Sequence, residues 1–159
     1  MKTLITCTVN GQEHTVLADT RDTLLDLLRE RIGLTGAKEG CGNGNCGTCT
    51  VIVDGAAVNA CLVLALEAPG RDIVTVEGMS ARGRLHPIQQ ALVEHGGTQC
   101  GFCTPGIVLS AKALLDSNAN PTAQDVRHAI AGNICRCTGY DKIVDAVMAA
   151  AATPPAQER

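Results

Sequence analysis

Apolar and polar residues alternate with a period of two near the start of the chain. The segments ITCTV (5–9) and HTVLA (14–18) flank Asn10-Gly11, a pair typical of two-residue hairpin turns. The apolar side chains of the first segment fall on one face: Ile5, Cys7 and Val9. We expect a hairpin of short strands here, with that face turned toward a core.

A helical period follows the hairpin. Apolar residues recur three and four positions apart between residues 24 and 32: Leu24, Leu25, Leu27, Leu28 and Ile32. Thr20 or Asp22 is the expected N-cap of this helix, and Gly33 is expected to end it.

The period of two returns after residue 49. TVIVD (50–54) and AAVNACL (56–62) flank the turn Asp54-Gly55, which predicts a second hairpin, and DIVTVEG (72–78) predicts one more strand. The first half of the chain is therefore expected to be a sheet with one helix.

From residue 86 the period changes to that of helices. Thr122 and Asp125 follow Pro121 with the spacing of a capping box. Four segments place apolar residues three and four apart: IQQALVEHG (88–96), PGIVLSAKALLDSN (105–118), TAQDVRHAIAGN (122–133) and YDKIVDAVMAAAA (140–152).

These patterns predict an α+β chain of two domains. A strand-rich domain is expected at 1–78 and a helical domain at 79–152, joined within GMSARGRLHP (78–87). The last residues, TPPAQER (153–159), are expected to be a disordered tail.

Composition excludes nucleic-acid binding. The chain has 159 residues, of which 45% are apolar, and its only aromatic residues are Phe102 and Tyr140, so it has almost no side chains for base stacking. The net charge of −3 divides into −4 for residues 1–80 (six basic, ten acidic) and +1 for the remainder (seven basic, six acidic). Neither half carries the basic patch that nucleic-acid partners require.

The first residues, MKTLITCTVNG, alternate in polarity, whereas a secretory signal needs an unbroken apolar run. No span of 18 apolar residues occurs either. We expect a soluble, cytoplasmic protein without membrane insertion, which would cross a membrane only with an exported partner. Because thiols stay reduced in the cytoplasm, nine cysteines indicate metal binding rather than disulfides.

Eight of these cysteines form two sets of four, one in each expected domain. The first set is Cys41, Cys46, Cys49 and Cys61, and the second is Cys100, Cys103, Cys135 and Cys137. The first spacing matches the C-x4-C-x2-C…C arrangement of plant-type 2Fe-2S sites.

The glycines of the first set support an iron-sulfur interpretation. They allow the main chain to approach an anionic cluster and to adopt positive φ: Gly40, Gly42, Gly44 and Gly47. Structural zinc is the competing interpretation, because zinc also takes four thiolates. A four-residue gap rich in glycine suits a larger cluster better than the short paired knuckles typical of zinc sites.

The second set leaves three interpretations open on spacing alone: iron-sulfur, zinc, or a redox-active CxxC pair. TQCGFCTPG precedes a helix that can begin at Pro105, and GNICRCTGY precedes one that begins near Tyr140. Two loops at helix starts can converge on one centre, with the positive helix ends facing an anionic cluster.

Other candidate residues favour ordinary structural roles. Cys7 lies on an apolar strand face and is expected to be a buried small hydrophobe. The four histidines occur in no ligand-like grouping: His14, His86, His95 and His128. Arg136 lies between two cysteines, where it either offsets cluster charge or is solvated. No general base, nucleophile or phosphate loop is apparent, so we predict no catalytic residue in this chain.

In combination, KEGCGNGNCGTCTVIVDG, NACL, TQCGFCTPGI and AGNICRCTGY resemble the iron-sulfur subunit of the xanthine oxidase family of molybdenum hydroxylases. The likeness runs from about residue 3 to residue 150, and all eight ligand positions are filled in order. It implies a plant-ferredoxin-like β-grasp domain followed by a four-helix bundle. It also implies a 2Fe-2S cluster in each domain.

The resemblance implies partners as well. A large subunit carries the molybdenum pterin cofactor and a medium subunit usually carries FAD. The helical-domain cluster lies next to the pterin, where Gln99 and Cys137 are the implied contacts, and the β-grasp cluster lies nearer the flavin. Electrons then pass from the pterin through both clusters to FAD or another acceptor.

Two other classes of function compete with this one. A free-standing carrier would shuttle electrons by diffusion, as a soluble ferredoxin does, and a zinc-binding interaction module would have no redox role. The substrate of the complex stays open among aldehydes, purines, other N-heterocycles, carbon monoxide and aryl-CoA thioesters.

Overall fold

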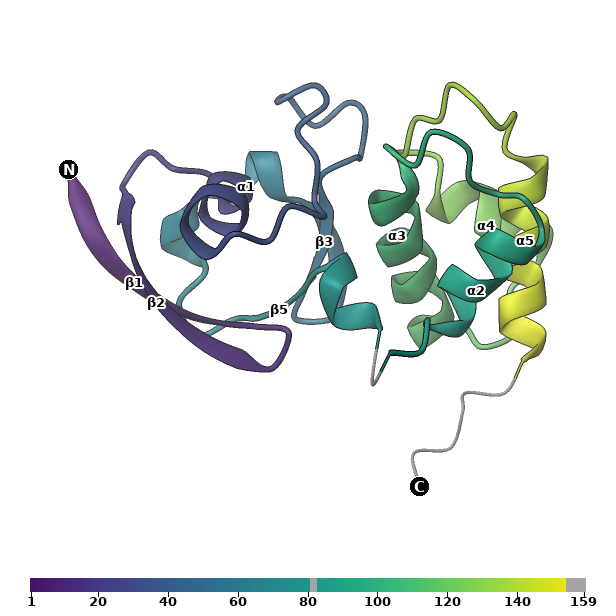
Figure 1. The fold of residues 1–159 in the computed structure, drawn as a ribbon, viewed down its shortest axis with the longest axis horizontal. Coiled ribbons are helices and arrows are strands. Elements are labelled where there is room, and N and C mark those ends of the chain that lie inside the picture. Colours follow the sequence, from purple (N-terminus) through teal and green to yellow (C-terminus); the bar gives the residue numbers. More distant parts are fainter. Residues whose placement is uncertain (81–82, 154–159) are drawn as a thin grey trace.

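The structure, a computed structural model, describes residues 1–80 and 83–153 (Figure 1). Strands and short helical turns form one half of the molecule, and longer helices form the other half. The expected α+β organisation is therefore confirmed at this level. The tail predicted at 153–159 falls, apart from Thr153, outside the described residues, as do residues 81–82 of the expected joint.

The first predicted hairpin is confirmed. Strand β1 (Lys2–Val9) pairs antiparallel with β2 (Gln12–Asp19) in full register from Lys2 opposite Asp19 to Val9 opposite Gln12. The turn residues Asn10 and Gly11 have φ of 52° and 74°, as such a tight turn requires. The face formed by Ile5, Cys7 and Val9 is buried.

The second hairpin consists of β3 (Thr50–Val53) and β4 (Ala56–Asn59), and β5 (Asp72–Val74) completes a sheet of order β2-β1-β5-β3-β4. Strand β5 runs parallel to β1 and antiparallel to β3. It is shorter than the predicted 72–78, because the Thr75 N–H donates to Asn10 Oδ1 and the chain then enters the 3-10 helix η4 (Val76–Met79).

The predicted N-cap of the first helix is wrong. Helix α1 (Leu24–Asp26) starts at Thr23, whose hydroxyl accepts from the Asp26 N–H while the Asp26 carboxylate accepts from the Thr23 N–H. Asp22 is engaged elsewhere, since its carboxylate accepts from the Asp19 N–H and pairs with Arg31. The chain continues as a π-helical segment, η1 (Leu27–Ile32), and ends at Gly33 as expected, with φ 89°.

In the part of the second half that the structure describes, four α-helices follow one another. They are α2 (Pro87–Glu94), α3 (Thr104–Ser117), α4 (Ala123–Ala129) and α5 (Asp141–Ala152). The capping box of Thr122 and Asp125 is confirmed at the start of α4. None of the helices in 1–80 and 83–153 has the length and apolar character needed to span a bilayer.

Each half of the molecule has its own apolar core. One lies between the sheet and the α1–η1 segment, and the other lies among α2 to α5. Ile52 of β3 belongs to the helical core, with Val74 and Val76 packed beside it. Strand β3 therefore contributes to both cores, and α3 packs directly against it. This contact brings the ends of the two halves that carry the cysteines to the same edge of the molecule (Figure 1).

Adjacent residues of β1 provide a test of the first core. Ile5 is 1% exposed and Leu4 is 70% exposed. We expect Ile5→Ala to lower the free energy of unfolding by about 2–5 kcal/mol, because it leaves a cavity. Leu4→Ala, the matched control on the solvent side, should change it by no more than about 0.5 kcal/mol. Urea unfolding followed by circular dichroism measures both; equal losses would contradict the assigned strand faces.

Candidate metal centres

Backbone N–H groups of the first cysteine loop stabilise the thiolate form of Cys41. The N–H of Asn43 and the side chain of Cys46, with the N–H groups of Cys46 and Asn45, lower the pKa of the Cys41 thiol to about 7. Cys41 is exposed at the tip of the loop. Donors of this kind favour the thiolate, which is the form that binds metal.

The other thiols of the first set lie deeper. Burial raises the pKa of Cys49 to about 11, and the Cys61 side chain contributes to that rise. Cys61 itself is held in the 3-10 helix η2 (Ala60–Leu62), directly after β4. The Cys46 side chain helps to lower the pKa of Cys41, and the charge of Cys46 helps to raise that of Cys49, so the thiols of the set act on one another.

The thiols of the second set also act on one another. Burial, followed by contact with the Cys135 side chain, raises the pKa of Cys103 to about 12. The Cys100 side chain raises the pKa of Cys137, and both of these thiols are exposed. Cys100 and Cys103 lie just before α3, and Cys135 and Cys137 lie just before α5, so both predicted helix starts are correct to within one residue.

Each cysteine set can be compared with two kinds of metal centre. Within residues 1–80 and 83–153, no group of three or more Cys, His, Asp or Glu side chains is arranged to hold a single ion. Structural zinc needs four ligands around one point. A binuclear 2Fe-2S centre takes two ligands on each of its two irons. Each set supplies the four thiols that such a binuclear centre requires.

The glycines leave room where a side chain would intrude. A Cβ at Gly40 would lie 2.9 Å from Cys46 Sγ and 2.8 Å from Thr48 Oγ1. At Gly47, where φ is 67°, a Cβ would lie 2.3 Å from the carbonyl oxygen of Gly132. The first position clears the cysteine sulfur and the second allows the loop to touch the helical half. The donors and the open cradle fit a bound 2Fe-2S cluster.

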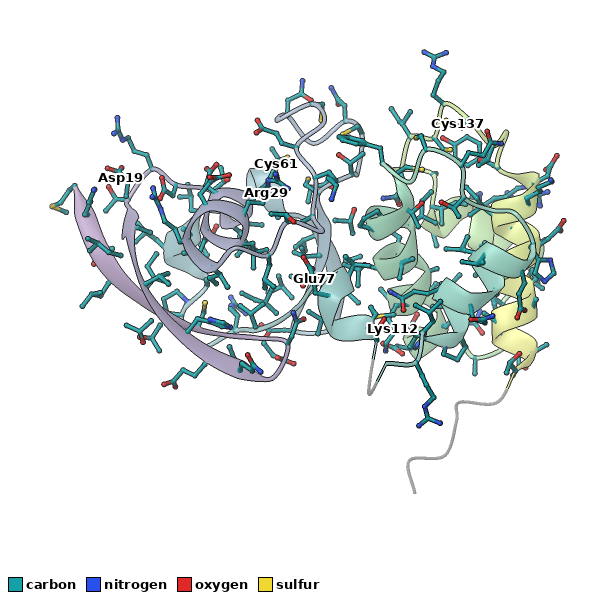
Figure 2. All side chains as sticks on the ribbon, in the orientation of Figure 1. Asp19, Arg29, Cys61, Glu77, Lys112 and Cys137 are labelled. Atoms are coloured by element: carbon teal, nitrogen blue, oxygen red, sulfur yellow. The ribbon has the colours of Figure 1, made fainter. Side chains whose placement is uncertain are left out.

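The two cysteine loops are in direct contact. The Ile134 N–H, one residue before Cys135, donates to the carbonyl oxygen of Cys46 over 2.9 Å. Figure 2 labels one cysteine of each set, Cys61 and Cys137, and both lie toward the edge of the molecule at which the loops meet.

Gln99 lies beside the second set. Its side chain is exposed, and its Nε2 donates to the carbonyl oxygen of Cys137 over 3.3 Å. The structure thus brings together the two residues that the resemblance paired.

Cys7 and Arg136 are other single residues for which the sequence predicts a role. Cys7 is 2% exposed and burial raises the pKa of its thiol, as expected for a core residue. Arg136 is exposed.

Several residues near the thiols were not anticipated. The hydroxyl of Thr48 lies 3.3 Å from Cys46 Sγ, and that of Thr138 lies 3.1 Å from Cys135 Sγ. A threonine two or three residues after a ligand cysteine is the signal that would have identified both. Tyr140 caps α5 with φ 71°, and its hydroxyl accepts from the Cys135 N–H and donates to the Asn133 carbonyl.

The close approach at Gly47 can be tested against a matched glycine. Gly55 also has positive φ, 84°, but a Cβ there would meet nothing within 4 Å. Gly55→Ala should cost about 1–2 kcal/mol of stability from backbone strain alone. Gly47→Ala should cost more and should also lower the iron content per chain, since the first loop must leave the helical half. Thermal unfolding measures the loss of stability, and iron analysis measures the iron content per chain. Equal losses in the two variants would refute the packing argument.

Comparison with known proteins agrees with this geometry. The family model described as "2Fe-2S iron-sulfur cluster binding domain" matches residues 7–73, and that described as "[2Fe-2S] binding domain" matches residues 75–148. The small subunit of nicotine 6-hydroxylase from Paenarthrobacter nicotinovorans is 52% identical over 140 residues, which cover 88% of this chain and 84% of that one.

A longer protein and a crystal structure also match this chain. Aldehyde oxidoreductase from Megalodesulfovibrio gigas is 52% identical over 148 residues, which are 91% of this chain but only 16% of that protein. The crystal structure of quinoline 2-oxidoreductase from Pseudomonas putida 86 matches with a TM-score of 0.92 and 43% identity, covering 95% of this chain and 94% of that chain. This chain belongs to the iron-sulfur small subunits of the xanthine oxidase family of molybdenum hydroxylases.

Proposed function

We propose that this chain relays single electrons inside a molybdenum hydroxylase, from a molybdenum pterin cofactor on a large subunit to FAD or another acceptor. The observation that carries the proposal is that eight thiols lie as two sets of four in loops that touch each other. A 2Fe-2S cluster in such a site accepts and returns one electron at a time.

The proposed ligands follow the two sets. The first cluster takes Cys41, Cys46, Cys49 and Cys61, and the second takes Cys100, Cys103, Cys135 and Cys137. Lowered thiol pKa at the exposed Cys41 and burial of Cys49 give the first set one accessible end and one dry end. The hydroxyls of Thr48 and Thr138 donate to ligand sulfur in the thiolate form and so stabilise negative charge on the cluster.

The second set is proposed to face the pterin. Gln99 and Cys137 are both exposed and adjacent, which supports their role as the pterin contacts, because a side-chain amide can bond the heteroatoms of that ring system. The first set is proposed to lie nearer the flavin. This chain contributes no catalytic residue to the reaction, so substrate chemistry belongs to the large subunit.

We also propose the finer fold assignments. The first domain, 1–78, is a plant-ferredoxin-like β-grasp fold, which the mixed sheet with α1 packed on it supports. The second, 79–152, is a four-helix bundle formed by α2 to α5, which their shared apolar core supports. A cytoplasmic location is proposed because none of the nine cysteines forms a disulfide in the structure.

The partners come from the relatives. Some are named as small or iron-sulfur-binding subunits, and this chain spans only 16% of the aldehyde oxidoreductase it matches. A large molybdenum pterin subunit and a medium FAD subunit are therefore proposed. Mass spectrometry of the proteins that co-purify with this chain tests the assembly. Recovery of the chain alone would instead favour a free-standing carrier.

The order of electron flow can be tested by removing one ligand. In the complete complex, Cys49→Ser should eliminate about half of the iron, the share of one binuclear centre. Substrate should still reduce the molybdenum, but turnover with an acceptor that draws electrons from the flavin should fall close to zero.

Cys7→Ser is the matched control, because Cys7 is equally buried and belongs to neither set. It should keep both clusters and normal turnover. Normal flavin-dependent turnover in Cys49→Ser would show that the first cluster does not lie on the exit route.

A further inference from the structure

Asn133 is a buried amide that spans the two halves of the molecule. It is 3% exposed, and its Nδ2 donates to the Gly47 carbonyl over 2.9 Å and to Thr50 Oγ1 over 3.2 Å. Its Oδ1 accepts from the Ser110 hydroxyl over 2.7 Å. Both N–H groups of the amide therefore reach the first domain, while its oxygen bonds to helix α3 of the second.

These partners are next to the cysteines of both sets. Gly47 lies between Cys46 and Cys49, and Asn133 lies two residues before Cys135. Ser110 belongs to α3, the helix that begins directly after Cys103. One side chain thus connects the loop of the first set, the loop that carries Cys135 and Cys137, and helix α3, which follows Cys103.

The backbone around Asn133 has no room to rearrange. A Cβ at Gly106 would lie 2.2 Å from the Gly47 carbonyl oxygen, so this part of α3 and the first loop touch through main chain. The Ile134 N–H bonds to the Cys46 carbonyl, directly beside the Asn133 contacts. The first loop cannot shift without breaking several of these contacts together.

Disorder in either loop would leave the Asn133 amide without its protein partners in a buried seam. An unpaired buried amide is costly, and hydrogen-bonded neighbours of this kind are coupled rather than additive. Metal ligation orders the loop that supplies the thiolates. Order in one loop is then transmitted to the other through Asn133, Gly47 and Ser110.

We propose that Asn133 is a positioning residue for both metal centres and that it makes retention of the two clusters cooperative. The proposal rests on the proposed function, since it assumes that each cysteine set holds a cluster. Asn133 binds neither cluster; it acts by holding the Gly47 carbonyl and α3 in a fixed relation.

The test uses the complete complex with its accompanying subunits. An iron chelator is added at rising urea concentrations, and electron paramagnetic resonance follows the loss of each cluster signal separately. In the unaltered protein, both signals should disappear at one common midpoint. In Asn133→Leu, the midpoints should separate, and the first cluster should be lost at the lower urea concentration.

Two control variants and one milder test variant isolate the coupling from ordinary destabilisation. Asn59 Nδ2 donates to the Gly44 carbonyl of the same first loop over 3.0 Å, but within the first domain only. Asn59→Leu should therefore move both midpoints together. Ser110→Ala removes one bond to Asn133 and should separate the midpoints less than Asn133→Leu does. Ser117→Ala, an exposed change on the same helix, should separate nothing.

The possible results distinguish failure of the coupling from failure of the proposed function. A common midpoint in Asn133→Leu, or separate midpoints in the unaltered protein, would overturn the cooperative coupling and leave the proposed function intact. Absence of both cluster signals from the unaltered complex would overturn the proposed function itself, and the coupling with it. If Asn133→Leu does not fold, Ser110→Ala decides, and identical behaviour of Ser110→Ala and Ser117→Ala would refute the proposal.

Discussion

The arrangement of both cysteine sets depends on the close approach of main chain to main chain at Gly47. A side chain at that position would collide with the Gly132 carbonyl, and one at Gly106 would collide with the carbonyl of Gly47 itself. Because neither residue has a Cβ, the first cysteine loop lies directly on the loop that carries Cys135. Strand β3 and helix α3 are packed together below this point, so the two sites lie at one edge of the chain.

The pKa shifts of the thiols in the two sets follow from how deeply each thiol is buried. In each set, one thiol near the surface is surrounded by donors or other thiols, and another is desolvated: Cys41 and Cys49 in the first, Cys137 and Cys103 in the second. Desolvated thiols hold their protons strongly, so metal binding must supply the free energy to deprotonate them. We therefore expect the metal to contribute to the stability of the folded chain, which links folding to cluster insertion.

Much of the fold could be predicted from local patterns. Asn10-Gly11 and Asp54-Gly55 identified both hairpins, and the change of period near residue 86 identified the helical half, because turn chemistry and periodicity are local properties. The N-cap of α1 could not be chosen this way, since Thr23 competes with nearby Asp22, and the contacts of Asp22 with the Asp19 N–H and with Arg31 decide between them. The early end of β5 likewise depends on Asn10, 65 residues away.

The residues of the candidate sites were likewise predicted from local sequence only in part. Spacing singled out the eight cysteines as candidate ligands, and the resemblance to a known family singled out Gln99 as a candidate pterin contact. Spacing said nothing about which thiols are neighbours, and it gave no reason to single out Asn133, whose partners Gly47 and Thr50 lie more than eighty residues away. Contacts of that kind exist only once the two halves are packed.

We propose that eight thiolates hold two binuclear iron centres in this one chain. Iron and acid-labile sulfide analysis of the anaerobically purified complex, combined with electron paramagnetic resonance after reduction, measures this. It should find roughly four irons and four sulfides bound by this chain and two distinct signals. Zinc in place of iron, or fewer than about two irons per chain, would contradict it.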